Sequence, residues 1–226
     1  MKLAVLTSGG DSPGMNAAIR AVVRQGIADG HQVFGYVEGY RGLTDDEEIE
    51  LDSQAVSEII DRGGTILRTS RFPEFREEKV QKKAISNLRK KGIKGLIVIG
   101  GEGSMKGAHA LAALNFKTIG VPASIDNDVF GTDFAIGFDT ALNTVIDVLG
   151  KLRDTASSHE RIFVVEVMGR HSGSIALNAG LAGGADYICL PDTPVTEPRR
   201  LNHIFKLVKE RYKRGKTHTL IIVAEG

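Results

Sequence analysis

The chain has 226 residues, and its 29 basic and 28 acidic side chains leave a net charge of +1, which offers nothing to attract nucleic acid or an anionic membrane. Its hydrophobic content of 42% is that of an ordinary globular protein, and no apolar stretch approaches the roughly 20 residues that cross a bilayer. The single cysteine, Cys189, excludes an internal disulfide, and we expect an inert buried thiol in a cytoplasmic protein.

Short apolar runs alternate with longer amphipathic runs, a pattern that predicts βαβ units. The expected strands are Leu3–Thr7, Gln32–Val37, Leu96–Ile99, Thr118–Val121, Ile162–Val167, Tyr187–Leu190 and Thr219–Ala224. The expected helices are Met15–Asp29, Gln54–Asp61, Glu77–Lys91, Met105–Leu114, Thr140–Thr155, Ser174–Ala182 and Leu201–Arg214. We therefore expect an α/β fold of two Rossmann-like lobes, with mostly parallel sheets and helices on both faces.

A weak change in composition near residues 137–140 suggests where the first lobe ends. We expect residues 1–138 to form one lobe and residues 139–226 a second, with the helix Thr140–Thr155 crossing between them. The last expected strand runs into Ala224-Glu225-Gly226, where the sequence stops, so the second lobe is expected to be incomplete.

Glycines follow two of the expected strands, in Ser8-Gly9-Gly10-Asp11 and in Gly100-Gly101-Glu102-Gly103-Ser104. Open α/β sheets bind ligands at this edge, and glycine lets main-chain N–H groups approach phosphate oxygens. Ser104 is expected to cap the following helix or to donate to a phosphate, and Glu102 to help hold Mg²⁺. Tight turns also need small residues, so these glycines alone leave structure and function open.

Two carboxylates follow a third strand, in Pro122-Ala123-Ser124-Ile125-Asp126-Asn127-Asp128. A kinase that acts on an alcohol needs a carboxylate to accept the hydroxyl proton, and Asp126 is our candidate. Asp128 would then orient Asp126 or a cation-bound water, and Ser124 would position a phosphate or the substrate. A simple Asx-turn would also explain the Asp-Asn-Asp run. Together with the two glycine turns, however, the run indicates phosphoryl transfer.

Two further observations bear on this interpretation. Arginines outside the helix faces are candidates to offset phosphate charge, namely Arg68, Arg71, Arg161 and Arg170. The spacing Gly101-x-Gly103-x-x-x-Gly107 is also compatible with an NAD(P) dehydrogenase, but the next strand does not end in the acid or arginine that would bind the ribose. That absence counts against hydride transfer.

Several longer motifs are more specific: Leu6-Thr7-Ser8-Gly9-Gly10-Asp11-Ser12-Pro13-Gly14-Met15-Asn16, Arg71-Phe72-Pro73-Glu74-Phe75, Ile125-Asp126-Asn127-Asp128, Arg153-Asp154-Thr155-Ala156-Ser157-Ser158-His159 and Val167-Met168-Gly169-Arg170. Through them the whole chain resembles the bacterial ATP-dependent 6-phosphofructokinases. The resemblance implies Mg²⁺-assisted transfer of a phosphoryl group from ATP to the 1-hydroxyl of fructose 6-phosphate, a step of glycolysis.

The resemblance also assigns residues. The ATP site is implied to contain Gly10, Arg71, Phe72, Gly101, Glu102, Gly103 and Ser104, with Glu102 at the metal position. The sugar site is implied to contain Ser124, Ile125, Asp126, Met168, Gly169, Arg170 and Glu225, and Arg161 is expected to reach the sugar phosphate of a neighbouring subunit. We expect the catalytic set to be Asp126, Asp128, Arg71 and Arg170.

A regulatory site is implied as well. ADP or phosphoenolpyruvate is expected to bind between subunits of a homotetramer, at Arg20, Arg24, Arg153, Gly184, Ala185, Asp186, Arg214, Lys216, Thr217 and His218. Ser53 stands where effector-responsive members often have an arginine, which leaves the response to effectors open.

Other departures from the family pattern concern the donor and the metal. Gly103 and Ala123 favour ATP, since pyrophosphate-using relatives tend to carry aspartate and lysine there. Glu102 replaces an aspartate and is one methylene longer, and Ala123-Ser124 replaces Gly-Thr. The family also extends roughly a hundred residues further, a segment of typical domain size. The alternative is therefore a catalytically impaired or regulatory nucleotide-binding fragment of the same fold.

Overall fold

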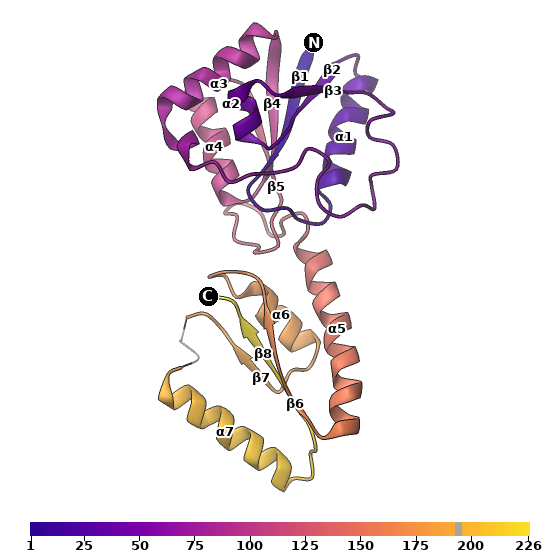
Figure 1. Cartoon of the computed structure of the whole chain (residues 1–226), viewed down its shortest axis with the longest axis vertical. Helices are drawn as coiled ribbons and strands as arrows, with labels where there is room; N and C mark the ends of the chain where they lie inside the picture. Colours follow the sequence, from indigo (N-terminus) through magenta and orange to yellow (C-terminus); the bar gives the residue numbers. More distant parts are fainter. Residues whose placement is uncertain (193–195) are drawn as a thin grey trace. The chain divides into compact units, whose positions relative to one another are not determined.

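A computed structural model describes residues 1–192 and 196–226 of the chain, which divide into two compact units. The first unit comprises Met1–Ser124 and Asp128–Gly137, and the second comprises Ile125–Asn127 and Phe138–Gly226. The sequence placed residues 125–127 in the first lobe. They group with the second unit, and the side chain of Ile125 packs against the core of that unit. Figure 1 draws the chain and labels its helices and strands.

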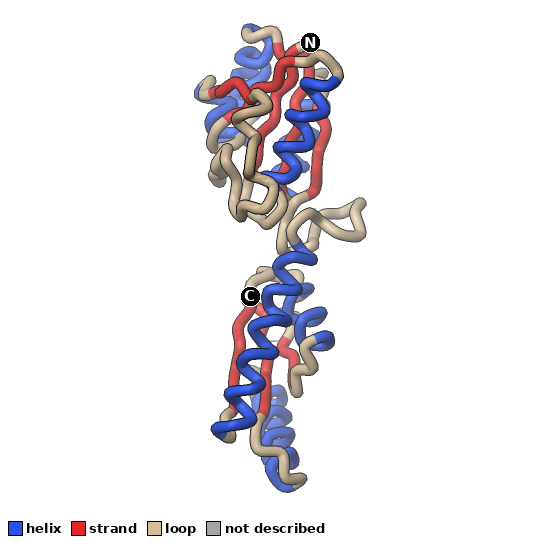
Figure 2. Tube along the Cα trace, turned by 90° about the vertical axis from the view of Figure 1, so that its right-hand side faces the viewer, coloured by secondary structure: helices blue, strands red, loops and turns tan. Residues whose placement is uncertain are grey.

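The first unit is built around one five-stranded sheet. Its elements are β1 (Lys2–Ser8), α1 (Met15–Ala28), β2 (Gln32–Tyr36), α2 (Tyr40–Asp45), β3 (Glu48–Leu51), the 3₁₀ turn η1 (Pro73–Arg76), α3 (Glu78–Lys90), β4 (Ile93–Gly100), α4 (Glu102–Ala113) and β5 (Thr118–Pro122). The strand order is β3-β2-β1-β4-β5, and only β3 runs antiparallel to its neighbour. Figure 2 colours the strands red and the helices blue. The carboxyl ends of β1, β4 and β5 therefore share one edge.

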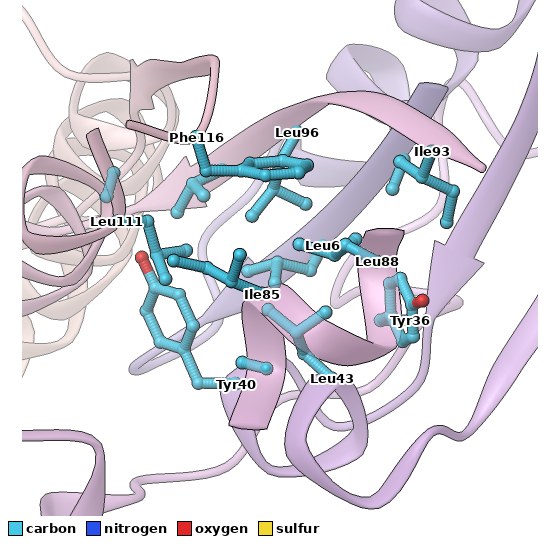
Figure 3. Close-up of a cluster of buried hydrophobic side chains, with 14 of the residues drawn as sticks. Leu6, Tyr36, Tyr40, Leu43, Ile85, Leu88, Ile93, Leu96, Leu111 and Phe116 are labelled. Carbon is cyan, nitrogen blue, oxygen red and sulfur yellow. The ribbon is translucent and has the colours of Figure 1, made fainter. Parts of the chain in front are cut away.

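Both faces of this sheet are covered by buried side chains. On β1, Ala4 and Leu6 belong to one cluster and Val5 to the other, as the two-residue period of a strand requires. The first cluster joins β1, β2 and β4 to helices α2, α3 and α4 (Figure 3). The second joins the sheet to α1 through Met15 and Ile19. A continuous apolar run such as β1 fits a central strand that is buried on both sides.

The second unit is smaller, and its described residues form one buried cluster, on one face of its sheet. It contains α5 (Phe138–His159), β6 (Ile162–Val167), α6 (Ser174–Ala182), β7 (Tyr187–Cys189), α7 (Pro198–Lys213) and β8 (Thr219–Ala224), with parallel strands in the order β6-β8-β7. Helices α5 and α6 supply its core together with residues of β6 and β8. Helix α7 has no buried residue, and Val164 on the outer side of β6 is 64% exposed.

The expected strands are all present, and Ile162–Val167, Thr219–Ala224 and the helix Ser174–Ala182 have the predicted bounds. The expected helix Gln54–Asp61 is wrong, because that segment forms turns. The Asp52 carboxylate accepts the N–H of Ala55 at 2.7 Å, and Glu58 has a φ of 53°, so the backbone there does not follow a helix. Within the described parts of the chain, every helix is too short or too polar to span a lipid bilayer.

Candidate functional site

The turn after β1 is held by the segment that carries two of the predicted ATP-site residues. The Thr7 hydroxyl donates to the carbonyl of Arg68 at 2.8 Å, and the Thr69 hydroxyl donates to the carbonyl of Gly9 at 2.8 Å. These bonds fix the start of the loop that leads to Arg71 and Phe72. The guanidinium-bearing Arg71 is exposed, whereas Phe72 packs against the first core cluster.

The turn after β4 differs from the sequence expectation at Ser104. Helix α4 begins at Glu102, so Ser104 is its third residue and does not cap it. The Ser104 side chain is buried, and its hydroxyl donates to the carbonyl of Ser8 at 2.8 Å. Its own carbonyl accepts the Tyr40 hydroxyl at 2.7 Å. Ser104 therefore joins the two glycine turns to each other, which is a structural role that sequence reasoning missed.

The main chain of the α4 N-terminus is suited to an anion. Helix bonding begins with the Met105 N–H, which donates to the carbonyl of Gly101 at 3.0 Å. The N–H groups of Glu102, Gly103 and Ser104 precede it and have no acceptor within the helix. Such groups, at the positive end of the helix dipole, are a common phosphate-binding arrangement.

Neither side-chain packing nor backbone conformation within the described chain requires glycine at positions 10 and 103. Neither glycine has a positive φ, and a Cβ added to either would meet no atom within 4 Å. Gly107, the third glycine of the dehydrogenase-like spacing, is different, because an added Cβ would lie 2.7 Å from the Tyr40 ring. Packing therefore explains Gly107, while Gly10 and Gly103 leave room for a ligand.

Glu102 is the predicted metal residue. Its side chain is 54% exposed, and one carboxylate oxygen lies 2.7 Å from the Lys106 ammonium. Among the described residues no three histidine, cysteine, aspartate or glutamate side chains gather to hold a metal ion. Mg²⁺ commonly uses one or two protein carboxylates together with substrate phosphates and water. Glu102 fits that mode, and the described chain supplies no closed metal cage.

Ser124 lies beside the glycine turn that follows β4. A Cβ added to Gly101 would lie 3.7 Å from the Ser124 side chain, so the two residues are neighbours. The Ser124 N–H donates to the carbonyl of Ile136 at 3.0 Å, and the Ser12 hydroxyl donates to the same carbonyl at 3.0 Å. The first unit thus gathers Ser124 with the glycine turns. Asp128 also lies in this unit.

The predicted sugar residues other than Ser124 and Arg161 gather at one edge of the second unit. The Ser172 hydroxyl lies 2.7 Å from the carbonyl of Asp126 and 2.9 Å from that of Gly169. The Glu225 N–H donates to the carbonyl of Val167 at 2.9 Å, which places Glu225 beside the Met168-Gly169-Arg170 segment. Met168, Gly169 and Arg170 follow the carboxyl end of β6, and Glu225 follows that of β8. Ser172 was not singled out from the sequence, because an isolated serine in a glycine-rich loop carries no signal.

Arg161 lies elsewhere. It directly precedes β6, and its carbonyl accepts the N–H of Thr219 at 3.2 Å. The six residues of β6 separate it from the Met168-Gly169-Arg170 segment, a rise of about 20 Å. Its own chain therefore does not bring Arg161 to the predicted sugar residues.

The predicted effector residues are divided between the two units. Arg20 and Arg24 on α1 donate to the carbonyls of Val56 at 2.7 Å and Ser53 at 3.3 Å. The remaining ones lie in the second unit: Arg153 within α5, Gly184, Ala185 and Asp186 between α6 and β7, and Arg214, Lys216, Thr217 and His218 between α7 and β8.

The side chains of Asp186 and Arg153 have partners within the second unit. The Asp186 carboxylate pairs with Arg211 at 2.6 Å and accepts the N–H of Leu220 at 2.9 Å. Arg153 donates to the carbonyls of Gly183 and Gly184. Arg211 was missed by the sequence analysis, because its place in the last turn of α7 is typical of any helix terminus.

Comparison with known proteins places this geometry in a family. The family model described as "Phosphofructokinase" matches residues 2–226. The chain is 53% identical to ATP-dependent 6-phosphofructokinase 1 of Clostridium perfringens and 55% identical to ATP-dependent 6-phosphofructokinase of Bacillus subtilis, covering all of this chain and 69% of each relative.

A solved structure agrees. The chain superposes on a phosphofructokinase from Saccharomyces cerevisiae with a TM-score of 0.90 and 41% identity, covering 100% of this chain and 34% of that one. The chain thus spans about two thirds of the length of the bacterial relatives and about a third of the yeast chain.

Proposed function

Because the chain belongs to the phosphofructokinase family, we propose that it carries out ATP-dependent phosphorylation of D-fructose 6-phosphate at the 1-hydroxyl, which yields fructose 1,6-bisphosphate and ADP. One observation carries the proposal at the level of the site. Gly10 follows β1 and Gly103 lies in the first turn of α4, which follows the neighbouring strand β4, and a Cβ added at either glycine would meet no atom within 4 Å. The first N–H groups of α4 have no acceptor within the helix and can donate to a phosphate. Membership of the phosphofructokinase family excludes the alternative of an NAD(P) dehydrogenase.

We place the nucleotide phosphates against these glycine turns, with Arg71 and Phe72 from the neighbouring loop. Main-chain N–H groups of Glu102, Gly103 and Ser104 would donate to phosphate oxygens. The hydroxyl of Ser104 supports this platform rather than the ligand, since it donates to the Ser8 carbonyl. A Cβ added at Gly103 would meet no atom within 4 Å, which supports space for the adenosine phosphates there, as in the ATP-dependent relatives.

Asp126 is the proposed general base. Its carboxylate accepts the proton of the sugar 1-hydroxyl as the oxygen bonds to the terminal phosphorus of ATP and the bond to ADP breaks. Ser124 lies beside Gly101, and a single residue, Ile125, separates it from Asp126, so the Cα atoms of Ser124 and Asp126 are at most about 7 Å apart. This covalent tether supports a base close to the phosphate platform.

Other charges complete the proposed site. Arg71 and Arg170 would offset charge on the transferring phosphoryl group, and Asp128 would orient Asp126. Glu102 would hold Mg²⁺ that arrives with ATP, and the bound ion would neutralise charge on the phosphates. The sugar is proposed to contact Ile125, Met168, Gly169 and Glu225.

Assembly and regulation extend the proposal. Arg161 lies a strand length from the other sugar residues of its own unit, which supports a role toward a neighbouring subunit of a homotetramer. The divided effector residues support an ADP or phosphoenolpyruvate site that needs two subunits. A cytoplasmic location fits a buried, unpaired Cys189.

The test replaces the proposed base. Asp126→Asn keeps the size of the side chain and removes its ability to take a proton, so kcat should fall by about 10² to 10⁴ while the Kd for ATP is unchanged. A coupled assay for fructose 1,6-bisphosphate and calorimetric titration with ATP measure the two quantities. Asp147→Asn, an exposed acid on α5 that pairs with Lys151, is the matched control and should retain full activity.

Other outcomes have definite meanings. Wild-type turnover in Asp126→Asn would refute the base assignment. ATP binding by the wild-type chain without turnover would replace the proposal by a non-catalytic nucleotide-binding chain of the same fold.

A further inference from the structure

We propose that Ser172 is a positioning residue that holds the main chain of Asp126 in place for proton transfer. The inference rests on the proposed function, because it takes Asp126 as the base. Its physical content is a hydrogen-bonded link between two segments of the second unit that are 46 residues apart in the sequence. Nothing in the motifs that indicate phosphoryl transfer includes this serine.

The Ser172 hydroxyl is a junction of three main-chain groups. It lies 2.7 Å from the Asp126 carbonyl and 2.9 Å from the Gly169 carbonyl, and it accepts the N–H of Ser174 at 3.3 Å. A hydroxyl has one proton to donate, so the two carbonyls share it, and the shorter bond is the one to Asp126. The hydroxyl therefore ties the base segment to the loop that precedes α6.

That loop is a firm support. Gly169, Arg170 and Gly173 all have positive φ, and the Ser172 N–H closes the turn by donating to the Gly169 carbonyl at 3.0 Å. A Cβ added to Gly173 would lie 2.7 Å from the Pro191 ring, so the loop packs tightly against the end of β7. The helix that follows is anchored by the buried Ile175.

The segment that receives the bond is short and has a second anchor. Ile125 packs its side chain into the core of the second unit, and Asn127 has a φ of 50°. The Asp126 carbonyl and carboxylate share one Cα, so a rotation of the peptide plane displaces the carboxylate as well. A misplacement of about 1 Å at a reacting group can cost roughly a hundredfold in rate. The bond from Ser172 restrains that rotation.

The hydrogen bond from Ser172 to the Asp126 carbonyl predicts that substitutions of Ser172 and of nearby Ser174 have different effects. Ser174 is the first residue of α6 and Ser172 lies two residues before it, and of these two described serines only Ser172 has a hydroxyl hydrogen-bonded to the Asp126 carbonyl. Ser172→Ala removes the link, Ser172→Thr keeps a hydroxyl at the same position, and Ser174→Ala is the matched control. A purely structural role for Ser172 would change stability without a specific effect on the step that Asp126 performs.

The experiment is a double-mutant cycle on the full chain, with kcat and the KM values for both substrates as readouts. Ser172→Ala should lower kcat about tenfold and leave the KM for ATP unchanged. Ser172→Thr should restore most of the loss, and Ser174→Ala should match the wild type. In the Asp126→Asn background Ser172→Ala should have no further effect, because the base it positions is gone.

A second readout does not depend on turnover. Amide hydrogen exchange of residues 125–127 should accelerate in Ser172→Ala and stay unchanged in Ser174→Ala. Unchanged exchange in Ser172→Ala, or unchanged kcat in that variant while Asp126→Asn is inactive, overturns the inference and leaves the proposed function standing. Failure of the proposed function gives a different result, namely full activity in Asp126→Asn.

Discussion

The two units of this chain differ in how completely buried side chains cover the faces of their sheets. In the first unit buried clusters cover both faces of a five-stranded sheet, and the central strand β1 is enclosed between them. In the second unit one described cluster covers one face of a three-stranded sheet. Helix α7 of that unit has no buried residue. Phe205 and Val164 are 60% and 64% exposed there.

The residues proposed for the site are divided between these two units. The glycine turns belong to the unit with two complete clusters, and buried bonds such as that from Ser104 to the Ser8 carbonyl hold them. Asp126 belongs to the unit with one cluster, and the bond that holds its main chain comes from the exposed Ser172. Phosphate recognition is therefore expected to tolerate little local motion, and base positioning is expected to be more easily perturbed.

The largest expected effect compares a core residue of the first unit with an outer residue of the second. Leu96→Ala should lower the free energy of unfolding by about 2–5 kcal/mol, because Leu96 is buried between the sheet and α3 and α4. Val164→Ala should change it by less than about 0.5 kcal/mol, because the side chain is largely exposed. Urea denaturation followed by circular dichroism measures both. Equal losses in the two variants would show that the outer face of β6 is covered in solution.

The next effect concerns tyrosine ionisation in the first unit. Burial raises the pKa of Tyr40 and, together with Glu48 and Asp46, that of Tyr36, in both cases beyond the usual alkaline range. Groups with a raised folded-state pKa stabilise the fold fully below their ordinary pKa of about 10, and that contribution is lost as the pH rises above it.

Absorbance at 295 nm during an alkaline titration tests this. Tyr36→Phe and Tyr40→Phe should each reduce the absorbance change that accompanies alkaline unfolding and leave the earlier, reversible change intact. A smaller reversible change in either variant would mean that the tyrosine ionises in the folded protein, and the first unit would then be less closed than described.

The sequence predicted the alternating strands and helices well where apolar residues recur at a regular spacing. The run Ile162–Val167 and the helix Ser174–Ala182 were predicted with their observed bounds, because alternation and helical spacing are local properties. The segment Gln54–Asp61 was wrongly predicted as a helix, because a local side-chain bond and a positive φ at Glu58 outweigh its spacing. The short strand β3 was missed, since two of its four residues are glutamates.

The sequence supplied candidate site residues, whose roles stay predictions, but it did not indicate the hydrogen bonds that these residues make. Residue types and motifs pointed to Gly10, Gly103 and Asp126, which depend on chemistry. The roles of Ser104 and Ser172 depend on carbonyls far away in the sequence, 96 and 46 residues distant. No local pattern encodes such partners, so only the folded structure reveals them. The convergence of all three turns around Asp126 stays a prediction.

The most direct test of the proposed phosphate site compares two helical glycines that both have room for an added Cβ. Gly103 in α4 and Gly150 in α5 both lie in helices, lack a positive φ and would accept a Cβ without contact. Alanine at either position should leave the fold intact or slightly stabilise it, because alanine favours helix. Calorimetric titration with ATP should show about tenfold weaker binding for Gly103→Ala, a loss of about 1.4 kcal/mol, and unchanged binding for Gly150→Ala. Equal ATP affinity in the two variants would contradict the claim that phosphate binds against the open glycines of the first unit.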